Sequence, residues 1–267
     1  MSKQMVALGR GSLAITTAGL AIMGLAYGDF APAWSAWPDW MPGRAVWIDG
    51  LALLLLAASV GLGFARLAVV SALVIGAYDV LWAVLAAPPI FVHPLSIGVW
   101  YGVVEALTAL AGTGVLYVLL RWSGTARPAA VARALCAGQV LLGVTCVFYG
   151  WSHFVYVEYT AGLVPAWLPG HSAIAYATGG AHIAAGMAMI VGILSRLAAT
   201  LEAIMMGLFG LFVWVPNFWV DPRPNWATPP QHLWTELVVT LLVAAGTGIV
   251  AIALSDRPWG RARRSSL

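Results

Sequence analysis

Seven ionisable side chains lie inside apolar runs that are long enough to cross a membrane. A charged side chain at the centre of a bilayer costs about 2.5–3.5 kcal/mol or more, so each is a candidate functional residue. Counted from the ends of the runs, six lie toward the same side, and only Glu202 lies toward the other. We therefore expect a polar layer that opens to one side. The seven residues are Asp49, Asp79, Glu105, His153, His182, Glu202 and Glu236.

His153 is the first candidate catalytic residue. It shares one helical face with Tyr149 and Tyr156, which are the candidate ligand-binding residues beside it. An imidazole between two phenols can relay protons or hydrogen-bond to a quinone carbonyl. The alternative is structural: a neighbouring hydroxyl satisfies the ring, and the histidine holds two helices in register.

Glu105 and His182 are the other two candidate catalytic residues. A carboxyl group inside a membrane suits general acid–base chemistry, and Glu105 lies one turn after Tyr101. His182 could pair with Glu202 or with Glu236 across the helix bundle. For both candidates the alternative is a structural polar contact between helices.

Three further residues are predicted to bind a ligand, and they are Tyr101, Asp79 and Trp100. We expect neither haem nor a metal, because the sequence has no HxxxH, ExxH or CxxCH spacing. There is no Walker A motif, no GxSxG motif and no readable serine–histidine–acid arrangement either. Nucleic acid is not an expected partner.

The composition is that of an integral membrane protein. Of the 267 residues, 61% are apolar and 9% are charged, whereas a soluble domain carries about a quarter charged residues. A bilayer core of about 30 Å needs roughly 20 helical residues. Eight runs meet this length, at about 11–28, 46–64, 67–86, 97–120, 134–157, 173–194, 197–216 and 232–254. We therefore predict an all-α protein with eight transmembrane helices.

Basic residues predict the orientation of these helices. With the N-terminus inside, the opposite side carries only Arg44 and Arg223. The positive-inside rule therefore predicts that both termini are cytoplasmic. The basic residues on the inner side are Lys3, Arg10, Arg66, Arg121, Arg127, Arg133, Arg196, Arg257, Arg261, Arg263 and Arg264.

The sequence contains one unit written twice. The stretches Tyr27–Arg44 and Tyr149–His171 both begin with Tyr-Gly and contain Pro-x-Trp-x-Pro-Gly. Later, Ala111–Leu120 (AGTGVLYVLL) matches Ala245–Leu254 (AGTGIVAIAL). We predict two modules, residues 1–126 and 127–267, of four helices each. Because each has an even number of helices, they are expected to be parallel repeats about an axis along the membrane normal.

The second module resembles a known family. The residues that carry the resemblance are Tyr149-Gly150, His153-Phe154, Thr160–His171 (TAGLVPAWLPGH), Ala175–Gly186 (AYATGGAHIAAG), Arg196–Ala199 (RLAA) and Leu211–Pro216 (LFVWVP). Together they resemble the DoxX-like (DoxX/DoxD superfamily) proteins, which are four-helix bacterial membrane modules. The chain therefore looks like a tandem of two such modules in a bacterial inner membrane. The first module departs from the pattern, because Asp29-Phe30 stands near where Ser152-His153-Phe154 would fall.

The resemblance implies a redox role. Some DoxX-like proteins are subunits of a thiosulfate:quinone oxidoreductase, and others are linked to membrane redox complexes. We expect a quinone or similar lipid in a cavity in the periplasmic half, and a membrane or periplasmic oxidoreductase as partner. Two alternatives stay open. One is an intramembrane enzyme that uses Glu/His acid–base chemistry on an apolar substrate, and the other is a non-catalytic assembly factor or transporter.

Overall fold

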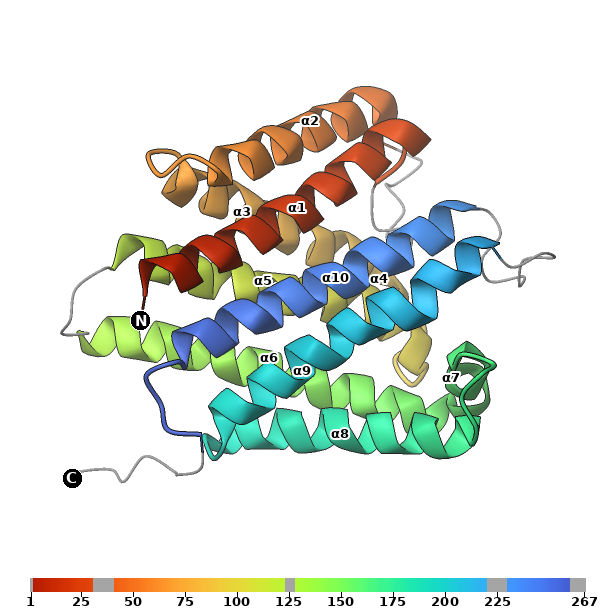
Figure 1. Cartoon of the computed structure of the whole chain (residues 1–267). Coiled ribbons are helices and arrows are strands. Elements are labelled where there is room, and N and C mark those ends of the chain that lie inside the picture. Colours follow the sequence, from red (N-terminus) through yellow and green to blue (C-terminus); the bar gives the residue numbers. More distant parts are fainter. Residues whose placement is uncertain (1, 31–40, 123–127, 220–229, 260–267) are drawn as a thin grey trace.

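The computed structural model describes residues 2–30, 41–122, 128–219 and 230–259, and in these ranges every regular element is a helix (Figure 1). Eight helical stretches are long and apolar enough to cross a membrane, as the sequence predicted. They contain α1 (Lys3–Tyr27), α2 (Arg44–Leu62), α3 (Ala68–Ala86) with the short α4 (Pro88–Val92), η1 (Ile97–Trp100) with α5 (Tyr101–Arg121), α6 (Ala129–Val155), α8 (His171–Val191), α9 (Ser195–Phe209) with its extension to Trp219, and α10 (Pro230–Ala253).

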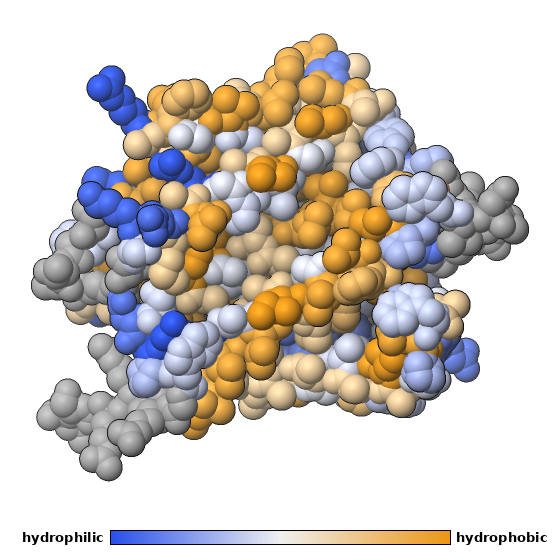
Figure 2. Space-filling model, in the orientation of Figure 1, coloured by the Kyte–Doolittle hydropathy of each residue, from blue (hydrophilic) through white to orange (hydrophobic). Residues whose placement is uncertain are grey.

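The surface is that of a protein that lies in a bilayer. Large apolar side chains are exposed along the helices, for example Leu54, Val70 and Ile204, each more than half exposed. Figure 2 shows hydrophobic residues across the middle of the molecule and hydrophilic residues gathered toward its two ends. Apolar surface on this scale marks contact with another apolar phase. Together with the eight helices, it indicates a multi-pass membrane protein.

Basic residues collect at one end of the bundle, which we call the terminal end because α1 begins there and α10 ends there (Figure 1). Among the described residues, only Arg44 lies at the opposite end, which we call the α7 end. The orientation itself stays a prediction. Arg127, Arg223, Arg261, Arg263 and Arg264 lie outside the described ranges. The basic residues at the terminal end are Lys3, Arg10, Arg66, Arg121, Arg133, Arg196 and Arg257.

Helix neighbours follow the same plan in both halves of the chain. In the first half α1 packs on α2, α2 on α3 and α3 on α5; in the second half α6 packs on α8, α8 on α9 and α9 on α10. Between the halves, α1 contacts α10, α5 contacts α6, and α5 contacts α10. At this last crossing Gly112 faces Gly246, so closely that a Cβ on Gly112 would overlap the Gly246 backbone. These two glycines occupy matching positions in the predicted repeat.

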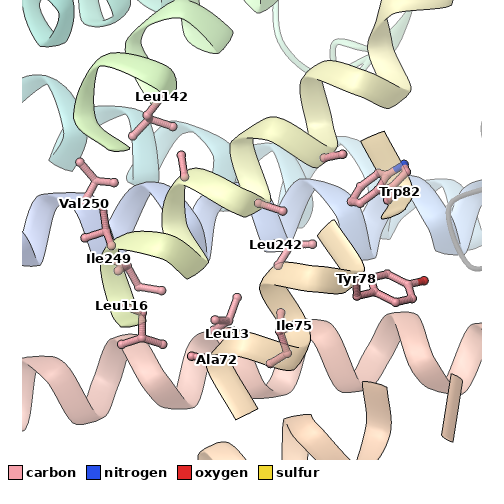
Figure 3. Packing of buried hydrophobic residues seen from close by; sticks show 14 of the residues in the cluster. Leu13, Ala72, Ile75, Tyr78, Trp82, Leu116, Leu142, Leu242, Ile249 and Val250 are labelled. Atoms are coloured by element: carbon pink, nitrogen blue, oxygen red, sulfur yellow. The ribbon is translucent and has the colours of Figure 1, made fainter. Parts of the chain in front are cut away.

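The apolar core is centred on α5 and α10. They belong to the two most buried spans, in which 61% and 56% of an 18-residue stretch is buried. Figure 3 shows Leu116 of α5 and Leu242 of α10 close to Leu13 of α1 and Ile75 of α3. All four side chains are at most 1% exposed. The two central helices therefore join the halves and give the cavity described below a rigid wall.

Glycines bring α6 and α8 into close contact. A Cβ on Gly150 of α6 would lie 2.5 Å from the carbonyl oxygen of Gly179 of α8. About two helical turns away along α6, at Gly143, a Cβ on Gly186 of α8 would lie 2.5 Å from the Gly143 carbonyl oxygen. Small residues let membrane helices approach at backbone distance. This approach places the side chains that follow on α6 directly against α8.

The structure differs from the predicted helix boundaries at one point that concerns the site. α6 ends at Val155, and Tyr156 adopts φ −110° and ψ 40°. A second short helix, α7 (Val157–Leu163), then begins. Tyr156 therefore does not continue the helical face of His153. Most of the first Pro/Trp loop, residues 31–40, lies outside the described residues, whereas the second loop, Val164–Gly170, is described.

Candidate functional site

A cavity of about 600 Å³ lies toward the α7 end of the second half, between α5, α6, α8, α9 and α10. α7 and the loop after it cover it on that side, through Leu163, Pro165 and Leu168. Cavities of 300–1,000 Å³ are typical of sites for drug-sized ligands. Six of the eight predicted site residues line it, although they come from three different helices and a turn. These are Tyr101, Glu105, Tyr149, His153, Tyr156 and His182.

His182 and Glu202 form the deepest polar contact of the site. His182 Nδ1 lies 2.6 Å from Glu202 Oε1, and both side chains are at most 1% exposed. Of the two partners that the sequence left open for His182, the structure selects Glu202. A carboxylate that accepts from Nδ1–H fixes the ring orientation and leaves Nε2 as the free acceptor. His182 itself lines the cavity, so the pair can present a basic nitrogen to a ligand.

The position of this pair along the helices differs from the predicted polar layer at one side of the membrane. His182 lies near the middle of α8, and Glu202 lies within α9 about two turns from its beginning. The polar cluster therefore extends to the middle of the spans instead of ending in a layer at one side. Beyond Glu202 lies the buried thiol of Cys146, which interacts with the Glu202 carboxyl.

His153 lies next to His182 of this pair. Its Nδ1 lies 3.1 Å from the hydroxyl oxygen of Thr178, whose own hydroxyl donates to the Ile174 carbonyl, 2.9 Å away. The His153 and His182 rings lie 5.1 Å apart, edge to face. The contact with Thr178 fits the structural alternative, because a hydroxyl satisfies one ring nitrogen of His153. His153 also lines the cavity, so its ring can contact a ligand there as well.

Two carboxyl groups meet at the opposite wall. Glu105 of α5 and Glu236 of α10 line the cavity and lie close enough to interact electrostatically. Glu105 is 7% exposed, and its Oε2 makes no hydrogen bond within the described ranges. A buried polar atom without a partner is costly. Glu105 is therefore the group of this wall with the most to gain from a hydrogen-bonding ligand.

Tyrosines connect the two walls. The Tyr149 hydroxyl lies 2.9 Å from the Thr108 hydroxyl, and the Tyr149 ring lies 6.1 Å from the His182 ring. The Tyr101 hydroxyl donates to the Ser152 hydroxyl at 2.5 Å. These contacts hold both phenol rings along the cavity wall. Flat aromatic walls of this kind favour the stacking of a flat ligand.

A π-helix shapes the remaining wall. α9 ends at Phe209 and continues as one π-helical segment, Gly210–Trp214. Phe209, Phe212 and Trp214 all line the cavity, which the 100° rotation per residue of a regular α-helix would make difficult. Such single-turn π-segments are frequent at functional sites. Here the segment turns three aromatic rings toward one cavity.

Two predicted site residues lie elsewhere. Asp79 is 1% exposed on α3, beside Thr113 and away from the cavity lining. Trp100 is more than one third exposed, and its indole N–H donates to the Pro94 carbonyl, 3.0 Å away. Asp49 is exposed on α2. In the described residues, no three His, Cys, Asp or Glu side chains are arranged to hold a metal ion.

Some residues of the site were not predicted as site residues: Glu236 lines the cavity, and Glu202 is the partner of the lining residue His182. Glu236 and Glu202 were recognised as ionisable, but pattern alone did not assign either to the site. The π-helix aromatics carried no signal, because an aromatic residue in a membrane span is ordinary. In the first half, Asp29 accepts from Arg44 at 2.6 Å, so that half uses an ion pair near the place where the second half has His153.

Comparisons with known proteins add no relative. No protein-family model, no curated protein and no solved structure matches this chain. The resemblance to DoxX-like proteins stays a prediction from the quoted residues.

Proposed function

We propose that the protein binds a quinone, or a flat lipid like it, in the cavity and exchanges protons with it. The observation that carries this proposal is the joint lining of one apolar aromatic cavity by Glu105, His153 and His182. Reduction of a quinone to a quinol takes up two electrons and two protons. The chain's own groups can supply hydrogen bonds and protons, and a partner oxidoreductase would exchange the electrons.

Each of the two polar walls of the cavity would contact a different end of the ligand. On one wall, Glu202 holds His182 so that the free nitrogen can accept a proton or a hydrogen bond. On the other wall, Glu105 has a buried oxygen without a partner in the described residues. A ligand with a carbonyl or hydroxyl at each end of a flat ring would meet both walls. Tyr149, between them, would stack against that ring.

The wider setting belongs to the same proposal. We infer two DoxX-like modules, residues 1–126 and 127–267, in a bacterial inner membrane with both termini cytoplasmic. The facing of Gly112 and Gly246 and the matching order of helix contacts support an axis between the modules. The gathering of basic residues at the terminal end supports the orientation.

The second candidate function is an intramembrane acid–base enzyme. The carboxylate–histidine pair favours it, because a positioned imidazole beside an apolar cavity is the arrangement of a general base. Mass spectrometry of lipids that copurify with the protein, followed by incubation of each lipid with fresh protein, distinguishes the two. Binding without conversion favours the first function, and conversion that needs His182 favours the second. A transport or assembly role is favoured if substitutions of the cavity residues change neither.

Binding of a quinone to the purified protein tests the proposal. We expect a naphthoquinone with a decyl tail to bind, and to quench the fluorescence of the lining Trp214. The substitutions Glu105→Gln and His153→Gln should each weaken this binding about tenfold, the effect of about 1.4 kcal/mol that one ligand hydrogen bond contributes.

The matched control is Asp79→Asn. Asp79 is an acid as buried as Glu105 but does not line the cavity, so its substitution should leave the affinity within about twofold. The proposal fails if the unaltered protein does not bind the quinone, or if Asp79→Asn weakens binding as much as Glu105→Gln.

A further inference from the structure

The helices α8 and α9 spread apart toward the α7 end. A tight turn joins them at the terminal end, where Gly192 and Leu194 both have positive φ, +83° and +55°. From this turn the two helices diverge (Figure 1). The cavity takes lining residues from both sides of this space, Ile174 and Thr178 of α8, and Leu208 of α9 with Phe212 of the π-helical segment that continues it. The space between the diverging helices is therefore part of the cavity.

This part of the cavity reaches the outer surface. Leu208 and Phe212 line the cavity and are nevertheless 45% and 44% exposed. Both belong to the span Ser195–Trp219, so the surface they share faces lipid. Figure 2 shows hydrophilic atoms between these two helices, within a surface that is otherwise hydrophobic. An opening between two spans, in their half toward the α7 end, leads sideways into a bilayer.

The α7 end of the cavity is covered instead. α7 and the following loop lie over it through Leu163, Pro165 and Leu168. The Trp167 ring packs edge to face on the Phe212 ring, 6.3 Å away. The cover carries Tyr159 and Thr160 of α7 as well as these apolar side chains, and it lies between the cavity and the water at this end. The bilayer is the more accessible of the two sources.

Chemical character changes along the cavity. The opening is formed by apolar side chains, Ile174, Leu208 and Phe212, whereas His182 and Glu105 lie deeper. No lysine or arginine lines the cavity in the described part of the chain. Phosphate groups are usually bound by such cations, so the cavity lacks the usual partners of an anion. The gradient fits a ligand with an uncharged polar head inside and a hydrocarbon tail in the opening.

We propose that the ligand enters sideways from the bilayer between α8 and α9, and that it is a lipid with an uncharged, hydrogen-bonding head and a long hydrocarbon tail. This inference rests on the proposed function and adds the route and the class of lipid. The tail remains in the opening beside Leu208 and Phe212 while the head meets the deep polar groups. A compact ring without a tail would leave the apolar opening unfilled.

Three probes on the unaltered protein in lipid nanodiscs test the class of ligand. They are a naphthoquinone with a decyl tail, the same ring without the tail, and decyl phosphate. We expect the tailed ring to bind about a hundredfold more tightly than the tailless ring in terms of total concentration, because the tail transfers the ring from water into the bilayer from which it enters. Decyl phosphate should not compete. Equal affinity for the two rings, or competition by decyl phosphate, would overturn the inference while the proposed function stands.

A pair of substitutions, one in α9 and one in the π-helical segment that continues it, tests the route. Leu208→Trp narrows the opening, and we expect it to slow association of the tailed ring about tenfold in stopped-flow fluorescence. The control is Leu211→Trp, at a residue that is 54% exposed in the same span but does not line the cavity; it should change the rate less than about twofold. Equal slowing by both variants, or by neither, contradicts the sideways route. If the unaltered protein binds neither ring, the proposed function falls, and this inference with it.

Discussion

Replacing Glu202 by leucine is expected to destabilise the protein by about 3 kcal/mol. Glu202 and His182 are ionisable, bonded at 2.6 Å and at most 1% exposed. Removing one partner of a buried ionisable pair costs about 3–5 kcal/mol, because the other partner is left without compensation. An ordinary hydrogen bond between membrane helices contributes only about 0.6 kcal/mol, and at most about 1.7. The measurement is the free energy of unfolding in mixed micelles, followed by circular dichroism.

A double-mutant cycle distinguishes the coupling energy between Glu202 and His182 from the effect of removing a carboxyl group alone. Glu202→Leu combined with His182→Leu should recover most of the stability, because neither ionisable group is then buried without its partner. Glu158→Ala removes an exposed carboxyl on α7 and should change the stability by less than about 0.5 kcal/mol. A coupling energy below about 1 kcal/mol would mean that the contact is an ordinary polar contact between helices.

The second large effect is expected from Gly150→Ala. The new Cβ would lie 2.5 Å from the Gly179 carbonyl oxygen and 2.8 Å from the Ile183 amide nitrogen. Both are backbone atoms of α8, so no side-chain rotation relieves the clash, and α8 must move away from α6. Overpacking of this kind costs about 1–3 kcal/mol, and we expect the upper end of that range. The separation of the helices should also weaken quinone binding, because His153 and His182 face each other across this contact.

Gly180→Ala provides a control of opposite sign. A Cβ at Gly180 would meet nothing within 4 Å, although the residue is adjacent to Gly179 on α8. Alanine is favoured over glycine inside a helix by about 0.5–1 kcal/mol. Gly180→Ala should therefore leave the stability unchanged or raise it slightly, and leave quinone binding unchanged. If both substitutions shift the unfolding free energy equally, the close approach of α6 and α8 is not what positions the histidines.

Hydropathy predicts most of this fold because the constraint it reflects is a physical one. A bilayer requires about 20 apolar helical residues for each crossing, so the number of spans could be counted directly. The breaks within spans could not. α6 stops at Val155, and α9 changes to a π-helix at Gly210, whereas the apolar runs predicted from the sequence, 134–157 and 197–216, continue past both points. These irregularities depend on tertiary packing, and they are the ones that shape the cavity.

The site was predictable as a set of residue types and not as a set of contacts. Ionisable side chains are rare in apolar spans, and this criterion selected Glu105, His153 and His182. All three line the cavity. The same criterion also selected Asp79, which lies on α3 beside Thr113 and does not line the cavity. Choosing between Glu202 and Glu236 as the partner of His182 needed the relative rotation of α8 and α9, which a pattern along one helix does not contain.

The central claim is that the cavity holds a lipid between its two polar walls. A cryo-electron microscopy map of the protein purified with its own lipids tests this claim most directly. We predict flat density between Glu105 and His182, with a tail that leaves between α8 and α9 beside Leu208. A well-resolved map in which this cavity holds only ordered water, or is closed by the approach of α9 to α8, would contradict the account.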